Sequence, residues 1–323
     1  MNTFPRNSHL TRLPGVICFS VCSLMGLLVL NLPAAPKVAQ TGKTFTSPEE
    51  AVGALVAAAN ARDRETLRSI FGPAANELVA VDEVQAANDL TEFIAALNQA
   101  KRLTRPTETT RILEVGKNRW PFPIPLAKKE GQWFFDTEAG KEEVLNRRIG
   151  KNELATLKSM RAYVEAQREY ASRDRQGNDV LQYAQKLFSS PGKKDGLYWS
   201  PDLDGEVSPL GPLAAQAQAE GYGKPAKDPS TAPRPYHGYF FKILTQQGRS
   251  APGGKYDYVI NGNMIGGFAL LAYPAQHGNS GVMTFIVNQR GRVYEKDLGA
   301  KTAQRALDIK EYDPDSSWRL SRD

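Results

Sequence analysis

The chain has 323 residues, of which 41% are hydrophobic and 24% charged, and its formal net charge is +6. This length is enough for about two domains with hydrophobic cores of their own. Basic and acidic residues are interleaved, and no alternation of basic and aromatic residues follows a nucleic-acid backbone. Composition therefore argues against nucleic acid as a partner.

The first 35 residues have the layout of a signal peptide. Arg6 and Arg12 precede an uncharged apolar run, and the small residues Ala34 and Ala35 follow it. We expect export to the periplasm or out of the cell, with cleavage near Ala34 and Ala35. The alternative is an inner-membrane anchor at residues 15–32, a stretch close to the roughly 18 to 20 apolar residues that span a bilayer. Membrane contact is expected only through this segment.

An exposed tether is expected over residues 36–45, followed by a helix. Ser47 can cap this helix, Pro48 suits its first turn, and Glu50 can reach back to the Ser47 amide. The helix is expected to end at about Asn60.

Two further helices are predicted before the first strands. One begins at Asp63 and stops at Gly72, which is followed by a proline. Asp89, with Glu92 three residues later, predicts the start of the next helix, which carries the sequence FIAALNQAKRL.

After Pro106 the pattern changes to strands, in the runs TTRILEVG, WPFPIPLAKKE and QWFFDT. The prolines in the second run predict an edge or bulged strand, because proline cannot donate to a central ladder. If every second residue points inward, Trp120, Phe122, Trp133 and Phe135 line a concave sheet face. They then either enclose a ligand cavity or fill a core. Helices followed by a bent sheet over residues 46–136 resemble the cone-shaped nuclear-transport-factor-two-like domains.

A helical connector is predicted over residues 137–150, ending at Gly150, with Asn152 as the cap of a long second helix. The apolar positions of the long helix recur every three to four residues, which places one side of it on a sheet. These positions are Leu154, Leu157, Met160 or Arg161, Val164, Arg168 and Ala171.

The rest of the chain, to residue 323, predicts a sheet interrupted by a proline-rich excursion. Residues 200–235 hold seven prolines and a short predicted helix, LAAQAQAE. The predicted strands are YFFKIL, YDYVI, FALLAYP, VMTFIVN and VYEKD, and the tail AQRALDI predicts a last helix with Trp318 packed back on the core. The fold class expected for the whole chain is α+β.

Little in the sequence carries chemistry. Both cysteines lie inside the apolar N-terminal run, and the two histidines beyond it, His237 and His277, have no cysteine or clustered acid beside them. We expect no catalytic constellation, no metal site and no cofactor. One alternative is calcium on the loop oxygens of Asp174, Gln176, Asn178 and Asp179, although their intervals depart from the EF-hand pattern.

The segment GKKDGLYW holds the densest cluster of interactive side chains: Lys194, Asp195, Tyr198 and Trp199. As a recognition loop it would combine charge with apolar area for a partner. As a structural turn it would plug the core with its aromatic end, with Asp195 bound to its own backbone. We treat these residues, with Trp120 and Trp133, as the binding candidates.

Blocks spread along the chain resemble one protein family. They include SPEEAV, WPFPIPL, YVEAQREYASRD, GKKDGLYW, PYHGYFFKIL and SGVMTFIVNQRG. In this order, over about residues 45–320, they resemble the bacterial exported family named domain of unknown function 2950. The resemblance implies export and supplies no activity.

The C-terminal half is also similar to the globular domain of type IV pilin-like proteins, in the order of its long helix, DGLYW, GYFFKI and the strands after AYP. In pilins the long helix continues into the membrane segment. Here a whole predicted domain intervenes, so the similarity concerns only the fold.

These observations favour an exported, non-catalytic binding or structural protein of the cell envelope, whose partner is an unknown envelope protein or a small molecule. Two alternatives stay open. One is a small-molecule hydrolase or isomerase that uses a buried acid such as Asp136 in an N-terminal cavity. The other is an accessory of pilus or secretion machinery.

Overall fold

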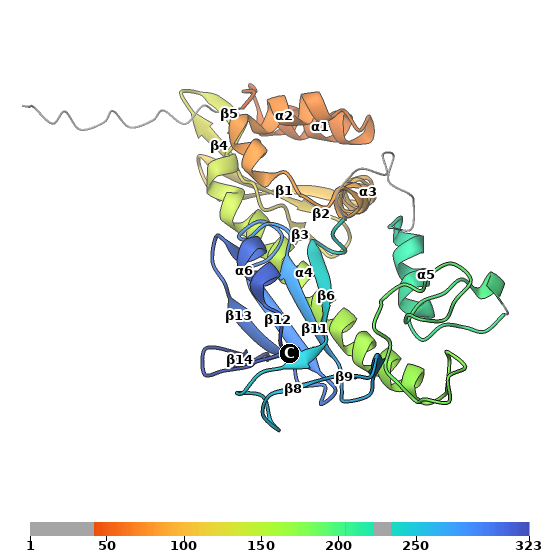
Figure 1. The fold of residues 1–323 in the computed structure, drawn as a ribbon. Coiled ribbons are helices and arrows are strands. Elements are labelled where there is room, and N and C mark those ends of the chain that lie inside the picture. Colours follow the sequence, from red (N-terminus) through yellow and green to blue (C-terminus); the bar gives the residue numbers. More distant parts are fainter. Residues whose placement is uncertain (1–41, 204, 223–233, 323) are drawn as a thin grey trace, which may run out of the picture. The chain divides into compact units, whose positions relative to one another are not determined.

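The computed structural model describes residues 42–203, 205–222 and 234–322 (Figure 1). These residues form helices and antiparallel sheets, so the predicted α+β class is confirmed. The predicted signal peptide, its cleavage residues and the alternative membrane anchor lie outside the described residues. Within those residues, no helix is both long and apolar enough to cross a membrane.

The N-terminal half begins with four helical segments. They are α1 (Pro48–Asn60), α2 (Arg64–Phe71), the 3-10 helix η1 (Pro73–Leu78) and α3 (Glu83–Gln99). As predicted, Ser47 caps α1 by accepting from the Glu50 N–H at 3.1 Å, and Asp63 caps α2. The Glu50 carboxylate accepts from the Thr46 N–H at 2.9 Å, which closes the first turn.

The start of α3 lies earlier than predicted. Asp82 is its cap and accepts from the Gln85 N–H at 3.0 Å, whereas the predicted cap, Asp89, lies in the middle of the helix. The prediction was wrong because both Asp82 and Asp89 precede the apolar run. Asp82, which is buried, makes the capping hydrogen bond.

Five antiparallel strands follow α3. They are β1 (Lys101–Thr107), β2 (Thr110–Val115), β3 (Trp120–Pro121), β4 (Leu126–Lys129) and β5 (Gln132–Phe135), in the order β1-β2-β4-β5 with β3 beside β2. The proline-containing β3 is two residues long, as expected of a strand that cannot extend a ladder. Strand β1 has mostly exposed side chains, so its sequence shows no apolar alternation and was not predicted.

Phe45 belongs to the hydrophobic core of the N-terminal half, called the first core below. This residue is 2% exposed, and it exchanges two backbone hydrogen bonds of 2.8 Å with Trp133 on β5. Phe45 therefore belongs to the folded core, which corrects the exposed tether expected up to residue 45.

Helix α4 (Thr137–Ala171) runs without a break for 35 residues, about 52 Å at 1.5 Å per residue. The predicted end at Gly150 and the predicted cap at Asn152 are wrong. Asn152 is fully buried in the helix interior, where its side chain accepts from Gln85 and donates to the Ser280 carbonyl. It thus connects α3 to the C-terminal half.

The C-terminal part of α4 packs on the second core. Leu157, Met160 and Val164 are buried as predicted, but Leu154 is 60% exposed. The buried face also includes Tyr163 and Tyr170. It is therefore rotated around the helix from the face predicted from the aliphatic residues.

The second sheet has the order β14-β13-β12-β11-β6 and is antiparallel. Its strands are β6 (Tyr239–Leu244), β11 (Ala269–Pro274), β12 (Met283–Asn288), β13 (Tyr294–Asp297) and β14 (Arg319–Leu320). Helices α4 and α6 (Thr302–Asp308) both contact β11. Nearly every side chain of β11 and β12 is buried, so this sheet is covered on both faces.

Shorter elements complete the C-terminal half. They are η2 (Pro201–Leu203), α5 (Gly211–Glu220), the pair β7 (Gln246–Gln247) and β8 (Tyr256–Asp257), and the pair β9 (Val259–Ile260) and β10 (Asn263–Met264). Buried Asp82 accepts from the Tyr222 hydroxyl at 2.8 Å and from the Gly238 N–H at 3.0 Å. These bonds attach the segments around α5 and β6 to the start of α3.

Candidate functional site

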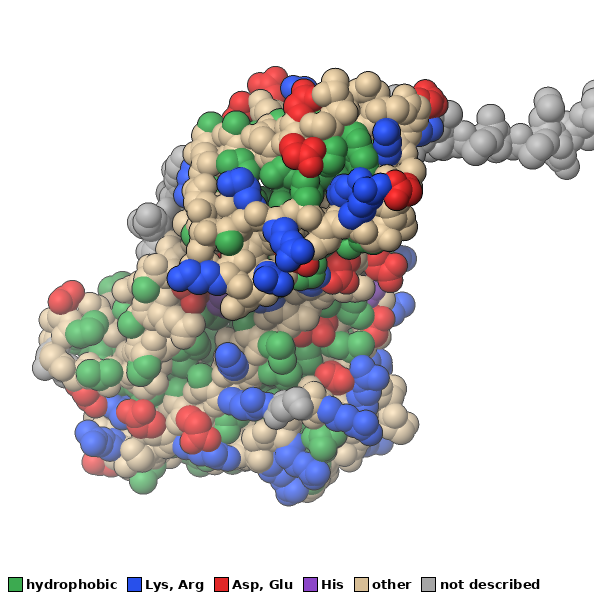
Figure 2. Space-filling model, turned by 180° about the vertical axis from the view of Figure 1, so that it is seen from behind, with side chains coloured by type: hydrophobic (Ala, Val, Ile, Leu, Met, Phe, Trp, Pro, Cys, Tyr) green, Lys and Arg blue, Asp and Glu red, His purple; other side chains and the backbone are tan. Residues whose placement is uncertain are grey.

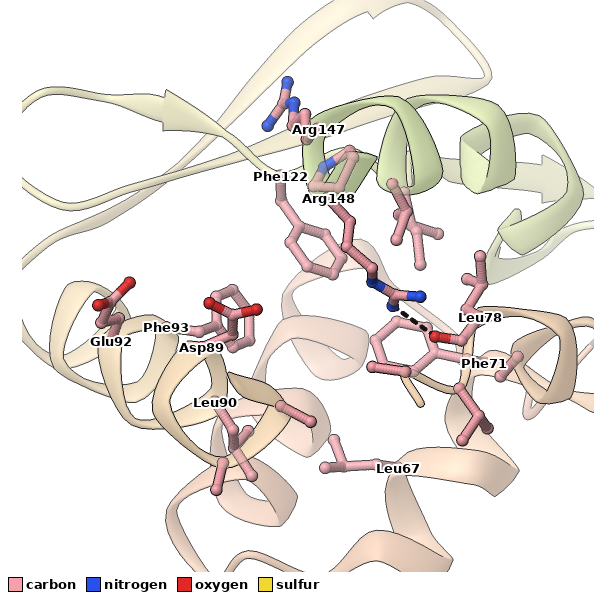
Figure 3. A pocket seen from close by; sticks show the side chains of 18 of the residues that line it. Leu67, Phe71, Leu78, Asp89, Leu90, Glu92, Phe93, Phe122, Arg147 and Arg148 are labelled. Atoms are coloured by element: carbon pink, nitrogen blue, oxygen red, sulfur yellow. Dashed lines mark hydrogen bonds between the residues drawn. The ribbon is translucent and has the colours of Figure 1, made fainter. Parts of the chain in front are cut away.

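A cavity of about 930 Å³ lies in the N-terminal half, between α2, η1, α3 and the first half of α4 (Figure 3). The segment around β3 forms another of its walls, through Trp120 and Phe122. Close packing holds α4 against this wall: a Cβ on Gly140 would lie 2.7 Å from the Ile124 Cα. Backbone packing at Gly140 therefore fixes the separation between α4 and this wall.

Part of the volume remains open because several of the residues that α3 turns toward it are small. Ala86, Ala87 and Ala96 of α3 line the cavity, as do Ala75 and Ala80 near η1. Alanine stabilises the helix yet fills little space, so these segments can be regular without meeting the opposite wall. Of the 17 residues of α3, only Gln85 and Leu97 are buried.

Aromatic and aliphatic side chains form the inner surface. Phe93 stacks on Phe122 with ring centroids 5.1 Å apart, and Phe71 lies 6.0 Å from Phe122. Figure 3 shows these rings and the side chains of Leu67 and Leu90 around one space. Such a wall favours an apolar ligand surface.

Charged residues surround this apolar interior, and six of them are basic against three acidic ones. The basic residues are Arg62, Arg64, Arg68, Arg147, Arg148 and Lys151, and the acidic ones are Glu83, Asp89 and Glu92. In Figure 2 lysine and arginine side chains also gather around hydrophobic ones on the part of the surface that belongs to the N-terminal half. The site is thus apolar inside and positively charged at its edge.

Two of the acids are already paired. Lys151 lies 2.7 Å from Asp89 and 3.6 Å from Glu92. Burial lowers the pKa of Lys151, but the bonds and charges of Asp89 and Glu92 outweigh it, and the net pKa is raised. Lys151 therefore stays protonated and is neutralised by α3.

Arg148 has a different environment. It donates to the Leu78 carbonyl at 2.5 Å and to the Asn279 side-chain oxygen at 3.0 Å, and both acceptors are neutral. Burial lowers the pKa of Arg148, and the charge of Asp89 opposes this effect. Figure 3 shows its guanidinium above Phe71, whereas Arg147 points to the outer edge.

Arg147 is occupied at the rim. It pairs with Glu143 at 2.6 Å, donates to the Pro121 carbonyl at 2.9 Å, and stacks on the Trp120 ring at 4.4 Å. Trp120 is 45% exposed. Together these residues form one edge of the cavity mouth.

The two tryptophans predicted to line this half have different places. Trp120 and Phe122 line the cavity, but Trp133 and Phe135 are buried in the first core and do not. The guanidinium of Arg111 covers the Trp133 ring at 4.8 Å. Trp120 lies on β3, which pairs with β2, and Trp133 lies on β5, which pairs with β4, so alternation within each strand did not predict which side chains share a face.

The loop with the other binding candidates has the contacts of a structural turn. Trp199 is 3% exposed and donates to the Glu206 carbonyl at 3.1 Å. Lys194 pairs with Glu206 and lies over the Trp199 ring. Tyr198 packs edge-on against Phe188. None of the four candidates of this loop lines the cavity described above: Lys194, Asp195, Tyr198 and Trp199.

Asp195 holds this turn together. It accepts from the N–H and hydroxyl of Ser190, at 2.7 and 2.9 Å, and from Lys186 at 2.7 Å. Partial burial raises the pKa of Asp195, but the bonds from Lys186 and Ser190 dominate and lower it to about 2. The carboxylate is thus fully used within the loop.

The other candidate groups are also committed to structure. Asp136 caps α4 by accepting from the Ala139 N–H at 3.1 Å, and it does not line the cavity, so the predicted buried base is wrong. Asp174 accepts from the N–H groups of Gln176, Gly177 and Asp179, so the carboxylate oxygens of this residue considered for calcium hold the turn.

The histidines lie apart, with His237 3.0 Å from Glu220 and His277 2.8 Å from Asp297. In the described part of the chain, no three histidine, cysteine or acidic side chains are grouped so as to hold a metal ion.

Sequence reasoning missed Arg148 and the acids facing it. The run GKEEVLNRR was taken as a solvated mixed-charge surface because basic and acidic residues alternate in it. The continuous helix would have been the clue, because residues 144, 147, 148 and 151 share one face at helical spacing. With a break assumed at Gly150, that face was not visible.

Comparison with known proteins gives one family. No curated protein and no solved structure was found to match the chain. A family model described as protein of unknown function (DUF2950) matches residues 42–320, which include the cavity, both sheets and α4. The resemblance noted in the sequence is thereby confirmed, and the protein belongs to the DUF2950 family.

Proposed function

We propose that this protein is an exported binding protein that holds a small, largely apolar molecule in the cavity between α2, η1, α3 and α4. The observation that carries the proposal is the cavity of about 930 Å³ with its wall of stacked phenylalanines. Small-molecule sites have volumes of roughly 300 to 1,000 Å³. A space of this volume, open to solvent at its mouth and lined with aromatic rings, fits a ligand site.

A binding role is favoured over catalysis by the state of the acids. Asp89 and Glu92 are paired with Lys151, and the acid expected to act as a base, Asp136, caps a helix outside the cavity. Export rests on the N-terminal sequence pattern described above. Turnover of a bound compound that a single cavity substitution abolishes would contradict the non-catalytic role.

The test uses the uncharged fluorescent dye Nile red with the purified protein. We expect saturable binding to one site, and at least about tenfold weaker binding to Ala86→Trp, whose indole would occupy the cavity. Ala57→Trp is the matched control, because Ala57 is exposed on α1 and does not line the cavity. Dye binding that does not saturate, or that Ala86→Trp leaves unchanged, would exclude the cavity as the site.

A further inference from the structure

The charges around the cavity are not balanced. Its six basic and three acidic residues leave an excess of positive charge. Lys151 is neutralised by Asp89 and Glu92, and Arg147 by Glu143. The excess therefore resides on Arg148 and on the exposed arginines of α2 and its preceding turn.

Arg148 is the basic residue best placed to act on a ligand. Among the described residues no carboxylate lies within ion-pair distance of it, and two of its five N–H donors have a recorded acceptor, both neutral. Asp89 acts on Arg148 through its charge but forms no ion pair with it, so a bound anion would offset desolvation that Asp89 only partly opposes. Its guanidinium also has the planar fork that matches a carboxylate or phosphate.

The position of Arg148 connects this charge to the apolar interior. Figure 3 places its guanidinium beside Leu78 and above Phe71, and on the same side as Phe122. A ligand group bound to the free donors would continue into the space between these rings. A purely apolar ligand would leave the Arg148 guanidinium without an ion pair.

We infer that the ligand is an amphipathic anion, with an apolar body that packs among the phenylalanines and one acidic group that binds Arg148. This inference rests on the proposed binding function and specifies its ligand class. A carboxylate and a phosphate monoester share the required chemistry, so both are included in the test.

The experiment measures displacement of Nile red by four compounds with the same twelve-carbon chain: dodecanoate, dodecyl phosphate, dodecanol and dodecylammonium, each below its micelle concentration. In the wild-type protein we expect at least one of the two anions to bind at least about tenfold tighter than dodecanol, with dodecylammonium weakest. Which anion binds better identifies the acidic group. Equal affinity for alcohol and anions, or preference for the ammonium, would overturn the inference while leaving the proposed function intact.

Variants then assign the preference to Arg148. In Arg148→Gln the affinity for the anion, measured relative to that for dodecanol in the same variant, should fall to about one. Arg148→Lys should retain part of the preference, because the charge remains and the fork is lost. Arg102→Gln is the charge-matched control, since Arg102 is exposed on β1 away from the cavity. An anion preference that persists in Arg148→Gln, or is lost equally in Arg102→Gln, would refute the role of Arg148. If Nile red fails to bind the wild type, the proposed function fails as well.

Discussion

The two halves of this protein pack helices against antiparallel strands, but one is filled and the other is hollow. In the C-terminal half, five of the six residues of β11 are buried, and aromatic side chains such as Phe268 and Tyr258 are fully enclosed. In the N-terminal half, α3 buries two of its 17 residues and turns alanines toward open space. Similar layers therefore produce either a core or a site.

The difference lies in side-chain size on the facing surfaces. The second sheet and α4 share one continuous buried cluster, whereas α3 faces the cavity with three alanines interspersed among larger side chains such as Phe93. In the N-terminal half the close approach of Gly140 to Ile124, which lines the cavity, holds α4 in place.

The largest expected difference between the halves concerns two tryptophans. Trp199→Ala should lower the free energy of unfolding by about 3 to 5 kcal/mol, because it removes a buried ring from the C-terminal core. Trp120→Ala should cost less than about 1 kcal/mol, because Trp120 is 45% exposed at the cavity mouth. Urea unfolding followed by circular dichroism measures both. Similar losses would mean that Trp120 is part of a packed core.

A second pair of substitutions tests the filling directly. Ala272→Leu adds volume to a fully buried position of β11 and should cost about 1 to 3 kcal/mol. Ala86→Leu adds the same volume beside the cavity and should change stability by less than about 1 kcal/mol in either direction. Thermal unfolding of the two variants provides the comparison. A large loss in Ala86→Leu would indicate that the space is needed for packing.

The smallest effect concerns the pH dependence of the turn at Asp195. Its pKa is lowered from 3.8 to about 2 in the folded protein, so its contribution is present above about pH 4 and is lost as the pH falls toward 2. The side chain is 20% exposed, and after allowance for screening the contribution is about 1 kcal/mol.

Asp195→Asn should therefore be less stable than the wild type at pH 7 and nearly equal to it at pH 2. Unfolding midpoints measured across this range check the expectation. Parallel curves for the two proteins would show that the carboxylate does not hold the turn in its ionised form.

Local rules predicted much of the fold. Capping at Ser47 and Asp63 fixed α1 and α2, and apolar runs located β6, β11 and β12. The break was predicted from the low helix propensity of Gly150 and from Asn152 as a possible helix cap. A glycine costs a helix only about 1 kcal/mol, and packing on both sides of this one outweighs that cost.

The site was harder to predict because it depends on which side chains meet across the fold. Tryptophans look alike in a sequence, yet Trp199 is enclosed and Trp120 lies at an opening. Arg148 stands in a run of alternating charges, and its lack of an acidic partner becomes visible only when α3 and α4 are placed together. The domain boundaries and the resemblances to cone-shaped and pilin-like folds stay predictions.

The uninterrupted α4 makes the protein difficult to dissect. Its first turns supply Arg147 and Arg148 to one half, and its later turns supply Leu157 and Met160 to the other. Cleavage within α4 would remove part of the cavity wall from one fragment or part of the buried helix face from the other. Truncated pieces would therefore be poor substitutes for the whole chain in assays.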